Sequence, residues 1–228
     1  MVAVITAPTN PLPHALRYLA LGDSYTIGES VDPMQRWPEQ WARLADAQGA
    51  RIEQPVTVIA RTGWTTDELL QGIEAADPPG TWDLVSLLIG VNNQYRGRSL
   101  ENFGTEYTRL AKTAIHLAHG EAGSVQALSI PDWGQTPFGA ACGRDVTQIA
   151  HEIDAFNACA KAVCEDLGIA FLDITALTRL HSADPRMHAE DGLHPSAQMY
   201  QLWAKALLFT GKFGRLSLRA REAHHNHE

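Results

Sequence analysis

The sequence lacks long apolar runs and lacks any concentrated group of basic residues. Its longest apolar stretches fall far short of the ~18–20 residues that a membrane-spanning helix needs, so we expect no stable membrane association. The formal net charge is −8, and no lysine- or arginine-rich segment is present. Because proteins that bind nucleic acid need a concentrated basic face, we also expect no nucleic-acid partner.

Cysteine is scarce as well. The chain has only Cys142, Cys159 and Cys164, and the last two lie on a predicted helix at a spacing that points them in different directions. We interpret all three as reduced, mostly buried small hydrophobic residues, which favours the cytoplasm. Residues 1–8 lack the basic region and the sustained apolar segment of a secretory signal, although a secreted mature form stays open.

Five apolar runs rich in leucine or β-branched residues divide the chain. Four of them show little alternation, which is typical of strands covered on both faces. The segments between them have helical spacing, most clearly in 103–117 and 146–167. Strands that alternate with helices indicate parallel pairing, and therefore a three-layer α/β/α sandwich. The five predicted strands are 16–21, 56–60, 84–89, 125–130 and 169–174.

The length of 228 residues suits a single α/β domain. We predict that this domain occupies residues 15–212, with an N-terminal extension at 1–14 and a C-terminal tail at 213–228. The histidines of the tail are interpreted as solvated rather than functional. The sequence gives no indication of the oligomeric state.

Two motifs near opposite ends of the chain contain residues suited to nucleophilic catalysis. Gly22-Asp23-Ser24-Tyr25-Thr26-Ile27-Gly28 follows the first predicted strand, and Asp191-Gly192-Leu193-His194-Pro195 precedes a predicted helix at 196–209, with Pro195 at its first position. A serine hydroxyl becomes an effective nucleophile when an imidazole takes its proton and a third group holds that imidazole. Ser24, His194 and Asp191 fit these roles. Taken alone, each motif fits a helix-capping arrangement equally well.

Two further segments extend this pattern. Gly63 follows the second predicted strand, and Gly90-Val91-Asn92-Asn93 follows the third. With the two end motifs, they resemble the sequence blocks of the SGNH (GDSL-type) hydrolase superfamily over about residues 16–210. One position departs from the family pattern, because Asn93 stands where the family usually has aspartate. The resemblance implies a flavodoxin-like, five-stranded parallel sheet of order 2-1-3-4-5.

The resemblance also implies a serine hydrolase of the esterase or lipase type, which cleaves small carboxylic esters through an acyl-enzyme and needs no cofactor. Ser24 would be the nucleophile, His194 the base and Asp191 the group that orients the base. The backbone N–H groups of Ser24 and Gly63 and the amide of Asn92 would form the oxyanion hole. A carbohydrate acetylesterase, a thioesterase and a lysophospholipase share these catalytic atoms. A flavodoxin-like binding module without catalysis is an alternative of another class.

The substrate pocket is less well marked in the sequence. The loop 131–144 follows the fourth predicted strand, so its aromatic residues are expected at the same sheet edge as the catalytic motifs. We name as candidate substrate-binding residues Tyr25, Trp64, Asn93 and Trp133, with Trp37 and Phe138 as further aromatic candidates. None of the histidines shows paired ligand spacing together with a second cluster, so no metal is expected, and we interpret them as surface or packing residues: His116, His119, His151, His181 and His188. Asp173, at the end of the fifth strand, is expected to make a structural hydrogen bond.

Overall fold

A computed structural model describes residues 15–214 of the chain, and its centre is a five-stranded sheet. Neighbouring strands pair in parallel in the order β2-β1-β3-β4-β5, which confirms the predicted sheet and its strand order. The strands are β1 (Tyr18–Gly22), β2 (Thr57–Ala60), β3 (Leu84–Leu88), β4 (Val125–Leu128) and β5 (Ala170–Leu172).

The position of each strand in the sheet explains its composition. Every residue of β1, β3 and β4 is buried, as continuous apolar runs require when helices cover both faces. The edge strands β2 and β5 are only partly buried. Continuous apolar runs in the sequence therefore mark the central strands more clearly than the edge strands.

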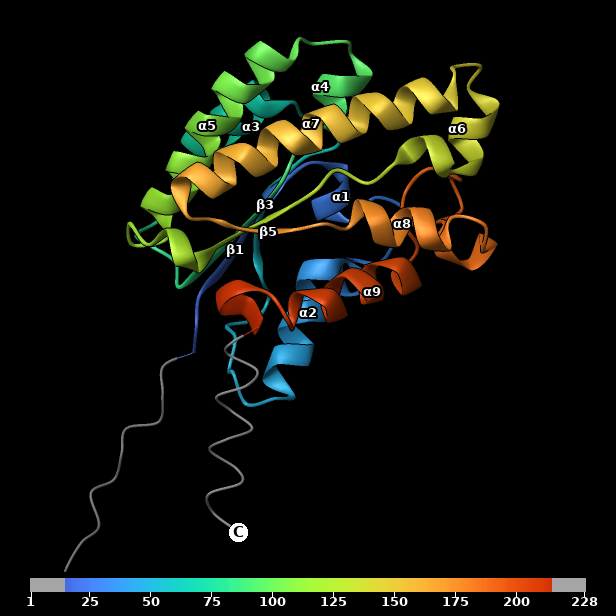
Figure 1. Cartoon of the computed structure of the whole chain (residues 1–228). Helices are drawn as coiled ribbons and strands as arrows, with labels where there is room; N and C mark the ends of the chain where they lie inside the picture. Colours follow the sequence, from blue (N-terminus) through green and yellow to red (C-terminus); the bar gives the residue numbers. More distant parts are fainter. Residues whose placement is uncertain (1–14, 215–228) are drawn as a thin grey trace, which may run out of the picture.

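Helices cover both faces of the sheet, which confirms the three-layer sandwich (Figure 1). One layer contains α3 (Thr66–Ala76), α5 (Leu100–Leu117) and α7 (Val146–Leu167), and α5 packs along α7. The opposite layer is built from α2 (Trp37–Asp46) and α9 (Ala197–Leu207), which pack against each other.

Short elements occupy the edge where the strands end. The helices α1 (Ser24–Ile27), α4 (Val91–Tyr95) and α8 (Thr175–His181) follow β1, β3 and β5, respectively. The loop after β4 carries η3 (Trp133–Gln135) and α6 (Pro137–Ala141). Three other 3-10 turns complete the described chain: η1 (Pro33–Gln35), η2 (Ala122–Ser124) and η4 (Pro185–Met187).

The start of the last helix differs from the prediction. Ser196 is the N-cap of α9, because its hydroxyl accepts a hydrogen bond from the Met199 N–H at 3.3 Å. Pro195 therefore lies outside the helix, where it forms an isolated antiparallel bridge with His188, and its placement at the first helical position was wrong. The catalytic-motif residues 191–194 consequently belong to an irregular segment between η4 and α9.

Packing also reaches beyond the predicted end of the domain. Phe213, which we assigned to the tail, is buried against Tyr18 and Trp41, with ring centroids 5.3 Å and 4.5 Å away. The predicted extension 1–14 and the tail from residue 215 onward lie outside the described residues.

The remaining minor assignments can be compared directly with the structure. Cys164 is buried, Cys142 and Cys159 are partly buried, and all three are free thiols. The carboxylate of Asp173 accepts hydrogen bonds from the Ser129 hydroxyl at 3.2 Å and the Ala176 N–H at 3.1 Å, so its structural role is confirmed.

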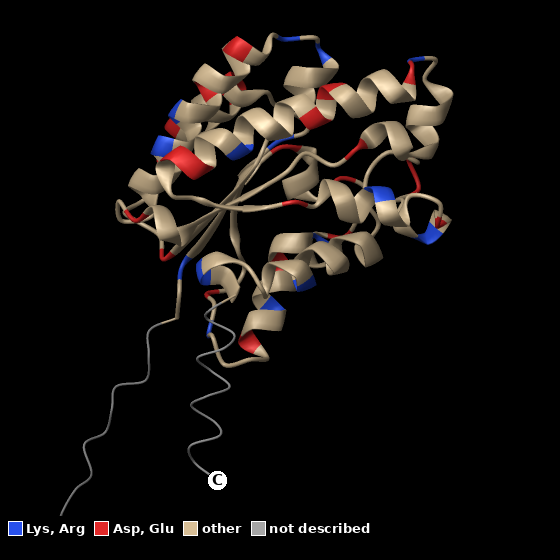
Figure 2. Ribbon diagram, in the orientation of Figure 1, with Lys and Arg blue, Asp and Glu red and all other residues tan. Residues whose placement is uncertain are grey.

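Over residues 15–214, no helix has the length and apolar character to cross a bilayer. Lysine and arginine alternate with acidic residues along the outer helices in the view of Figure 2.

Candidate active site

Ser24 lies at the turn that joins β1 to α1. The N-cap of α1 is Asp23, whose carboxylate accepts a hydrogen bond from the Tyr25 N–H at 3.0 Å, so the Ser24 hydroxyl is not used for capping. Gly22 is required by close packing, because a Cβ atom there would lie 2.5 Å from the Leu88 carbonyl oxygen. The turn therefore holds Ser24 at the carboxyl end of a central strand.

The predicted pair of His194 and Asp191 is formed. Nδ1 of His194 lies 2.6 Å from Oδ2 of Asp191, while Oδ1 accepts hydrogen bonds from the N–H groups of Leu193 and His194, both at 2.9 Å. Partial burial by itself would raise the pKa of Asp191, but hydrogen bonds from Ser30, His194 and Leu193 outweigh it and hold this pKa well below its usual range. Asp191 is therefore a fixed, charged partner for the imidazole.

The two other residues predicted for the oxyanion hole follow the neighbouring strands: Gly63 lies in the loop after β2, and Asn92 lies in the short helix after β3. Gly63 has a positive φ of 87°, and its carbonyl oxygen accepts a hydrogen bond from Arg96 Nη2 at 2.7 Å. Asn92, in α4, donates one amide hydrogen to the Trp64 carbonyl at 2.9 Å, which fixes the orientation of the amide. An amide carries two hydrogens, so Asn92 keeps a second donor for a ligand.

One cavity connects these four chain segments. Its volume is about 250 Å³, and Ser24, Gly63, Asn92 and His194 all line it. Within the described residues no hydrogen bond joins Ser24 Oγ to His194, although both side chains border this space. The other lining residues are Tyr25, Thr62, Val91, Tyr95, Trp133, Phe138 and Leu193.

A comparison with protein-family models gives a match over residues 20–202 to the GDSL-like lipase/acylhydrolase family, which is most of the chain. The chain belongs to this family. A comparison with curated protein sequences finds no significant match.

Solved structures with low sequence identity share the fold of this GDSL-family chain. The lipase/acylhydrolase from Enterococcus faecalis has a TM-score of 0.64 at 19% identity, covering 90% of this chain and 96% of the other. The esterase EstA from Pseudoalteromonas sp. has a TM-score of 0.62 at 16% identity, covering 84% and 93%. The phospholipase A1 from Streptomyces albidoflavus has a TM-score of 0.61 at 21% identity, covering 85% and 98%. The shared architecture is the SGNH fold.

The position at which this GDSL-family chain departs from the usual motif has a structural partner. Asn93 is fully buried; its amide oxygen accepts from the Thr66 N–H at 3.1 Å, and its nitrogen donates to the Thr66 hydroxyl at 2.7 Å. Asn93 thus ties α4 to the start of α3, and it is not among the residues that line the cavity.

Of the other predicted pocket residues, some line the cavity and some do not. Tyr25, Trp133 and Phe138 line the cavity. The Trp64 ring lies over Gly72 of α3, away from the lining residues, and Trp37 is fully buried in the core. Proximity in sequence to a motif therefore does not decide which aromatic rings reach the cavity.

Several residues of the site were missed in the sequence analysis. Val91 and Tyr95 flank Asn92 and share one face of α4, a spacing that the sequence does contain. Leu193 lies beside His194 within the motif of residues 191–195. Ser30 has no such signal: its hydroxyl donates to Oδ2 of Asp191 at 2.6 Å across 161 positions of sequence.

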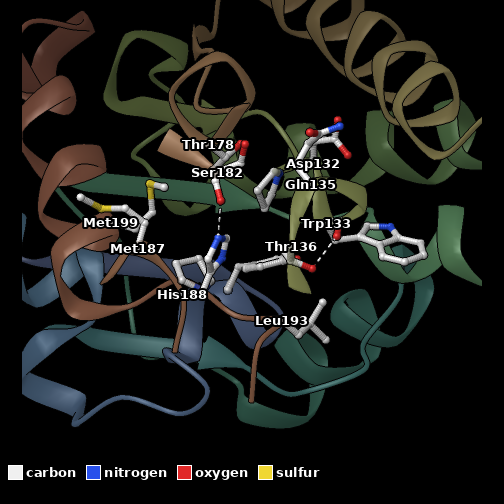
Figure 3. Close-up of a pocket in the computed structure, with 13 residues that line it drawn as sticks. Asp132, Trp133, Gln135, Thr136, Thr178, Ser182, Met187, His188, Leu193 and Met199 are labelled. Atoms are coloured by element: carbon white, nitrogen blue, oxygen red, sulfur yellow. Dashed lines mark hydrogen bonds between the residues drawn. The ribbon is translucent and has the colours of Figure 1, made fainter. Parts of the chain in front are cut away.

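A second, much smaller cavity shares Tyr25, Trp133 and Leu193 with the first. Figure 3 shows His188 pointing toward Ser182, and the distance from Nε2 to the Ser182 carbonyl is 2.8 Å. The volume of this second cavity, about 20 Å³, is large enough for a single water molecule. This arrangement fits the prediction that His188 is a packing residue.

Proposed function

We propose that this GDSL-family protein hydrolyses carboxylic esters through an acyl-enzyme formed on Ser24. The observation that carries the proposal is the shared cavity, because Ser24, Gly63, Asn92 and His194 come from four distant segments and line one space. The bond between His194 and Asp191 supports the assignment of the imidazole as the base. The nucleophile, the base and the oxyanion donors that acyl transfer requires are therefore available at one place.

In the first half of the reaction, Ser24 Oγ attacks the ester carbonyl carbon while its proton passes to His194 Nε2. Negative charge develops on the carbonyl oxygen, and the N–H groups of Ser24 and Gly63 and the amide of Asn92 stabilise it. His194 then gives its proton to the departing alkoxide as the carbon–oxygen bond breaks. The alcohol leaves, and the acyl group stays on Ser24.

In the second half, water replaces the alcohol. His194 takes a proton from the water, whose oxygen attacks the acyl carbon, and the proton then returns to Ser24 Oγ when the acid is released. Asp191 keeps the imidazole oriented through both halves, because it holds Nδ1 and leaves Nε2 free to exchange protons.

Two of the alternatives fit the lining of the cavity less well. A sugar ester would call for several hydrogen-bonding groups, but beyond Ser24, Asn92 and His194, which already have roles, the lining offers only the hydroxyls of Thr62, Tyr25 and Tyr95 and an indole N–H that is already bonded to Gln94. A binding module without catalysis gives no reason for a serine, a histidine and a carboxylate to converge at one cavity. The mainly apolar lining favours an apolar ester.

The test is labelling by a fluorophosphonate probe together with hydrolysis of p-nitrophenyl acetate. We expect the probe to modify Ser24, located by peptide mass spectrometry, and Ser24→Ala to lower kcat by ~10⁴-fold or more. Ser182→Ala is the matched control, since Ser182 is half-buried outside the catalytic cavity. Full activity in Ser24→Ala, or labelling at another serine, would end the proposal.

A further inference from the structure

An aromatic wall borders one side of the catalytic cavity. We give this name to Tyr95, Trp133 and Phe138, which come from α4, η3 and α6. The rings of Tyr95 and Trp133 meet edge to face with centroids 5.4 Å apart, and Phe138 lies 6.2 Å from Trp133. Tyr95 and Phe138 are partly exposed, whereas Trp133 is buried.

A chain of polar contacts holds the wall in place. The indole N–H of Trp133 donates to Gln94 at 2.8 Å, Gln94 donates to Glu152 at 2.6 Å, and Glu152 pairs with Arg144 at 3.2 Å. The guanidinium of Arg144 returns to the wall, lying 5.2 Å from the Trp133 ring centre and 5.6 Å from that of Tyr95. These contacts fix the position of Trp133 and hold Arg144 against the rings of Trp133 and Tyr95.

The reaction geometry indicates which part of the ester meets this wall. The leaving alcohol must receive its proton from His194, so it occupies the side of the cavity next to His194. The acyl carbonyl points its oxygen toward Asn92, and Val91 and Tyr95 lie on the same short helix as Asn92. With the alcohol next to His194, the acyl group is left with the rest of the cavity, whose lining includes Tyr95 and Trp133.

Resting on the proposed ester hydrolysis, we infer that the aromatic wall selects short or aromatic acyl groups over long alkyl chains. The cavity volume of about 250 Å³ is below the ~300–1,000 Å³ that drug-sized ligands occupy. A butyryl or benzoyl group can pack against the rings, whereas the far end of a dodecanoyl chain has to leave the cavity.

The test keeps the alcohol constant and varies the acyl group: p-nitrophenyl acetate, butyrate, benzoate and dodecanoate. We expect kcat/KM to be highest for butyrate and benzoate. Trp133→Ala should lower the ratio of kcat/KM for benzoate to that for acetate by ~10-fold, the size of an aromatic contact. Tyr95→Ala should lower it by ~3- to 10-fold; this residue is half exposed, so the variant tests the wall even when Trp133→Ala fails to fold.

Leu180→Ala is the matched control, because Leu180 is 74% exposed and does not line the cavity. Its benzoate-to-acetate ratio should equal that of the unmodified protein. A preference for dodecanoate, or an unchanged ratio in Tyr95→Ala, overturns the inference while ester hydrolysis stands. If the unmodified protein cleaves none of the four esters, the proposed function itself fails.

A different observation concerns the segment that follows α1. The carbonyl of Ser24 accepts hydrogen bonds from the N–H groups of Gly28 and Glu29, both at 3.0 Å. The Glu29 carboxylate accepts a hydrogen bond from the hydroxyl of Thr62, the residue before Gly63. The Ser30 hydroxyl donates to Oδ2 of Asp191, the oxygen that also bonds His194. Residues 28–30 thus contact the nucleophile turn, the loop of Gly63 and the carboxylate of the triad.

The backbone of Ser30 shows that this contact has a conformational cost. Its φ is 65°, in the left-handed region that residues other than glycine seldom adopt. We propose that Ser30 is a positioning residue for the same proposed reaction, acting through Asp191. Oδ2 of Asp191 is bonded by His194 and also by the Ser30 hydroxyl. The bond from Ser30 fixes the carboxylate so that Oδ2 faces His194 Nδ1.

A double-mutant cycle tests this role. Ser30→Ala should lower kcat for p-nitrophenyl acetate by roughly 3- to 20-fold with KM unchanged, because one hydrogen bond to a charged group is lost at an exposed position. In an Asp191→Asn background the same change should have no further effect, since the partner is already altered. Equal losses in both backgrounds would show that Ser30 does not act through Asp191.

Two other substitutions separate the hydroxyl from the backbone strain. Ser30→Gly relieves the positive φ but removes the donor, so it should lose as much kcat as Ser30→Ala. Ser30→Asn supplies an amide donor and tolerates the left-handed region, so it should recover part of the activity. Full activity in Ser30→Gly would assign the effect of Ser30→Ala to strain and overturn the proposal.

Discussion

The two halves of the candidate site are held in different ways. Ser24, Gly63 and Asn92 follow β1, β2 and β3, which are hydrogen-bonded neighbours in the sheet. Asp191 and His194 belong to an irregular segment that individual bonds hold to the rest of the molecule, such as Phe138 N–H to the Gly192 carbonyl at 2.9 Å and the Ser30 hydroxyl to Asp191 Oδ2 at 2.6 Å. The sheet itself fixes the first half, whereas a few specific contacts fix the second.

Apart from removal of the nucleophile itself, the largest effect is expected in the second half. Asp191→Asn retains an oxygen for the backbone N–H groups but loses the charge that faces the imidazole, so kcat should fall by ~10⁴-fold. The pKa of Asp191 is depressed, so its carboxylate stays charged as pH falls well below neutrality, and Asp191 does not cause the loss of activity on the acid side. Hydrolysis of p-nitrophenyl acetate measured across pH checks both points.

Asp184→Asn is the control for this prediction. Asp184 precedes the same irregular segment and pairs with the exposed Arg186, but it does not line the cavity. A comparable loss of kcat in Asp184→Asn would mean that the segment responds to any lost carboxylate, and the contrast between the two halves would disappear.

A smaller effect is expected from a donor in the first half. Asn92→Ala removes one of the proposed oxyanion donors while leaving the sheet intact, so kcat should fall by ~10²- to 10³-fold with little change in KM. Asn102→Ala, on the exposed side of α5, is the matched amide deletion. Steady-state kinetics on the two variants measures this effect. If kcat falls no further in Asn92→Ala than in Asn102→Ala, Asn92 does not stabilise the oxyanion.

The smallest expected effect concerns stability and the residue beside Ser24. Burial raises the pKa of Asp23 to about 7, and its Oδ2 atom has no hydrogen-bond partner among the described residues. Because this folded-state pKa lies above the unfolded value, the folded protein binds the proton more tightly. Its stability should therefore fall as pH rises between about 4 and 7 and level off above that.

Asp23→Asn removes this charge but keeps an oxygen for the Tyr25 N–H. The difference in free energy of unfolding between Asp23→Asn and the unmodified protein should move in favour of the variant by ~2–4 kcal/mol from about pH 4 to about pH 8. Urea unfolding at the two pH values measures it. Asp32→Asn, a cap substitution at the exposed start of η1, separates burial from the loss of a capping charge. A difference independent of pH would contradict the raised pKa.

The sequence predicted the first half of the site better than the second half and the pocket. Ser24, Gly63 and Asn92 were placed correctly because apolar strands mark where the chain reaches one sheet edge. The bond between Asp191 and His194 was also predictable, since the two residues are three positions apart. Ser30 was not, because its contact with Asp191 joins a turn near one end of the domain to a loop near the other.

The pocket shows why side-chain positions are harder to predict than strands. Trp64 lies next to Gly63 in sequence, yet its ring packs over Gly72, while Tyr95 reaches the cavity from the far end of α4. Which ring faces a cavity depends on packing between helices, and local periodicity does not encode it. Asn93 illustrates the same point, since its amide is used to join two helices.

The contact between Phe213 and Tyr18 has a geometric consequence. Tyr18 is the first residue of β1, so both limits of the packed region lie at the amino ends of the strands, roughly 16 Å of strand away from the edge where Ser24 stands. The described part of the chain therefore begins and ends on the side of the sheet opposite the candidate site, and the full length of β1 separates both limits from Ser24.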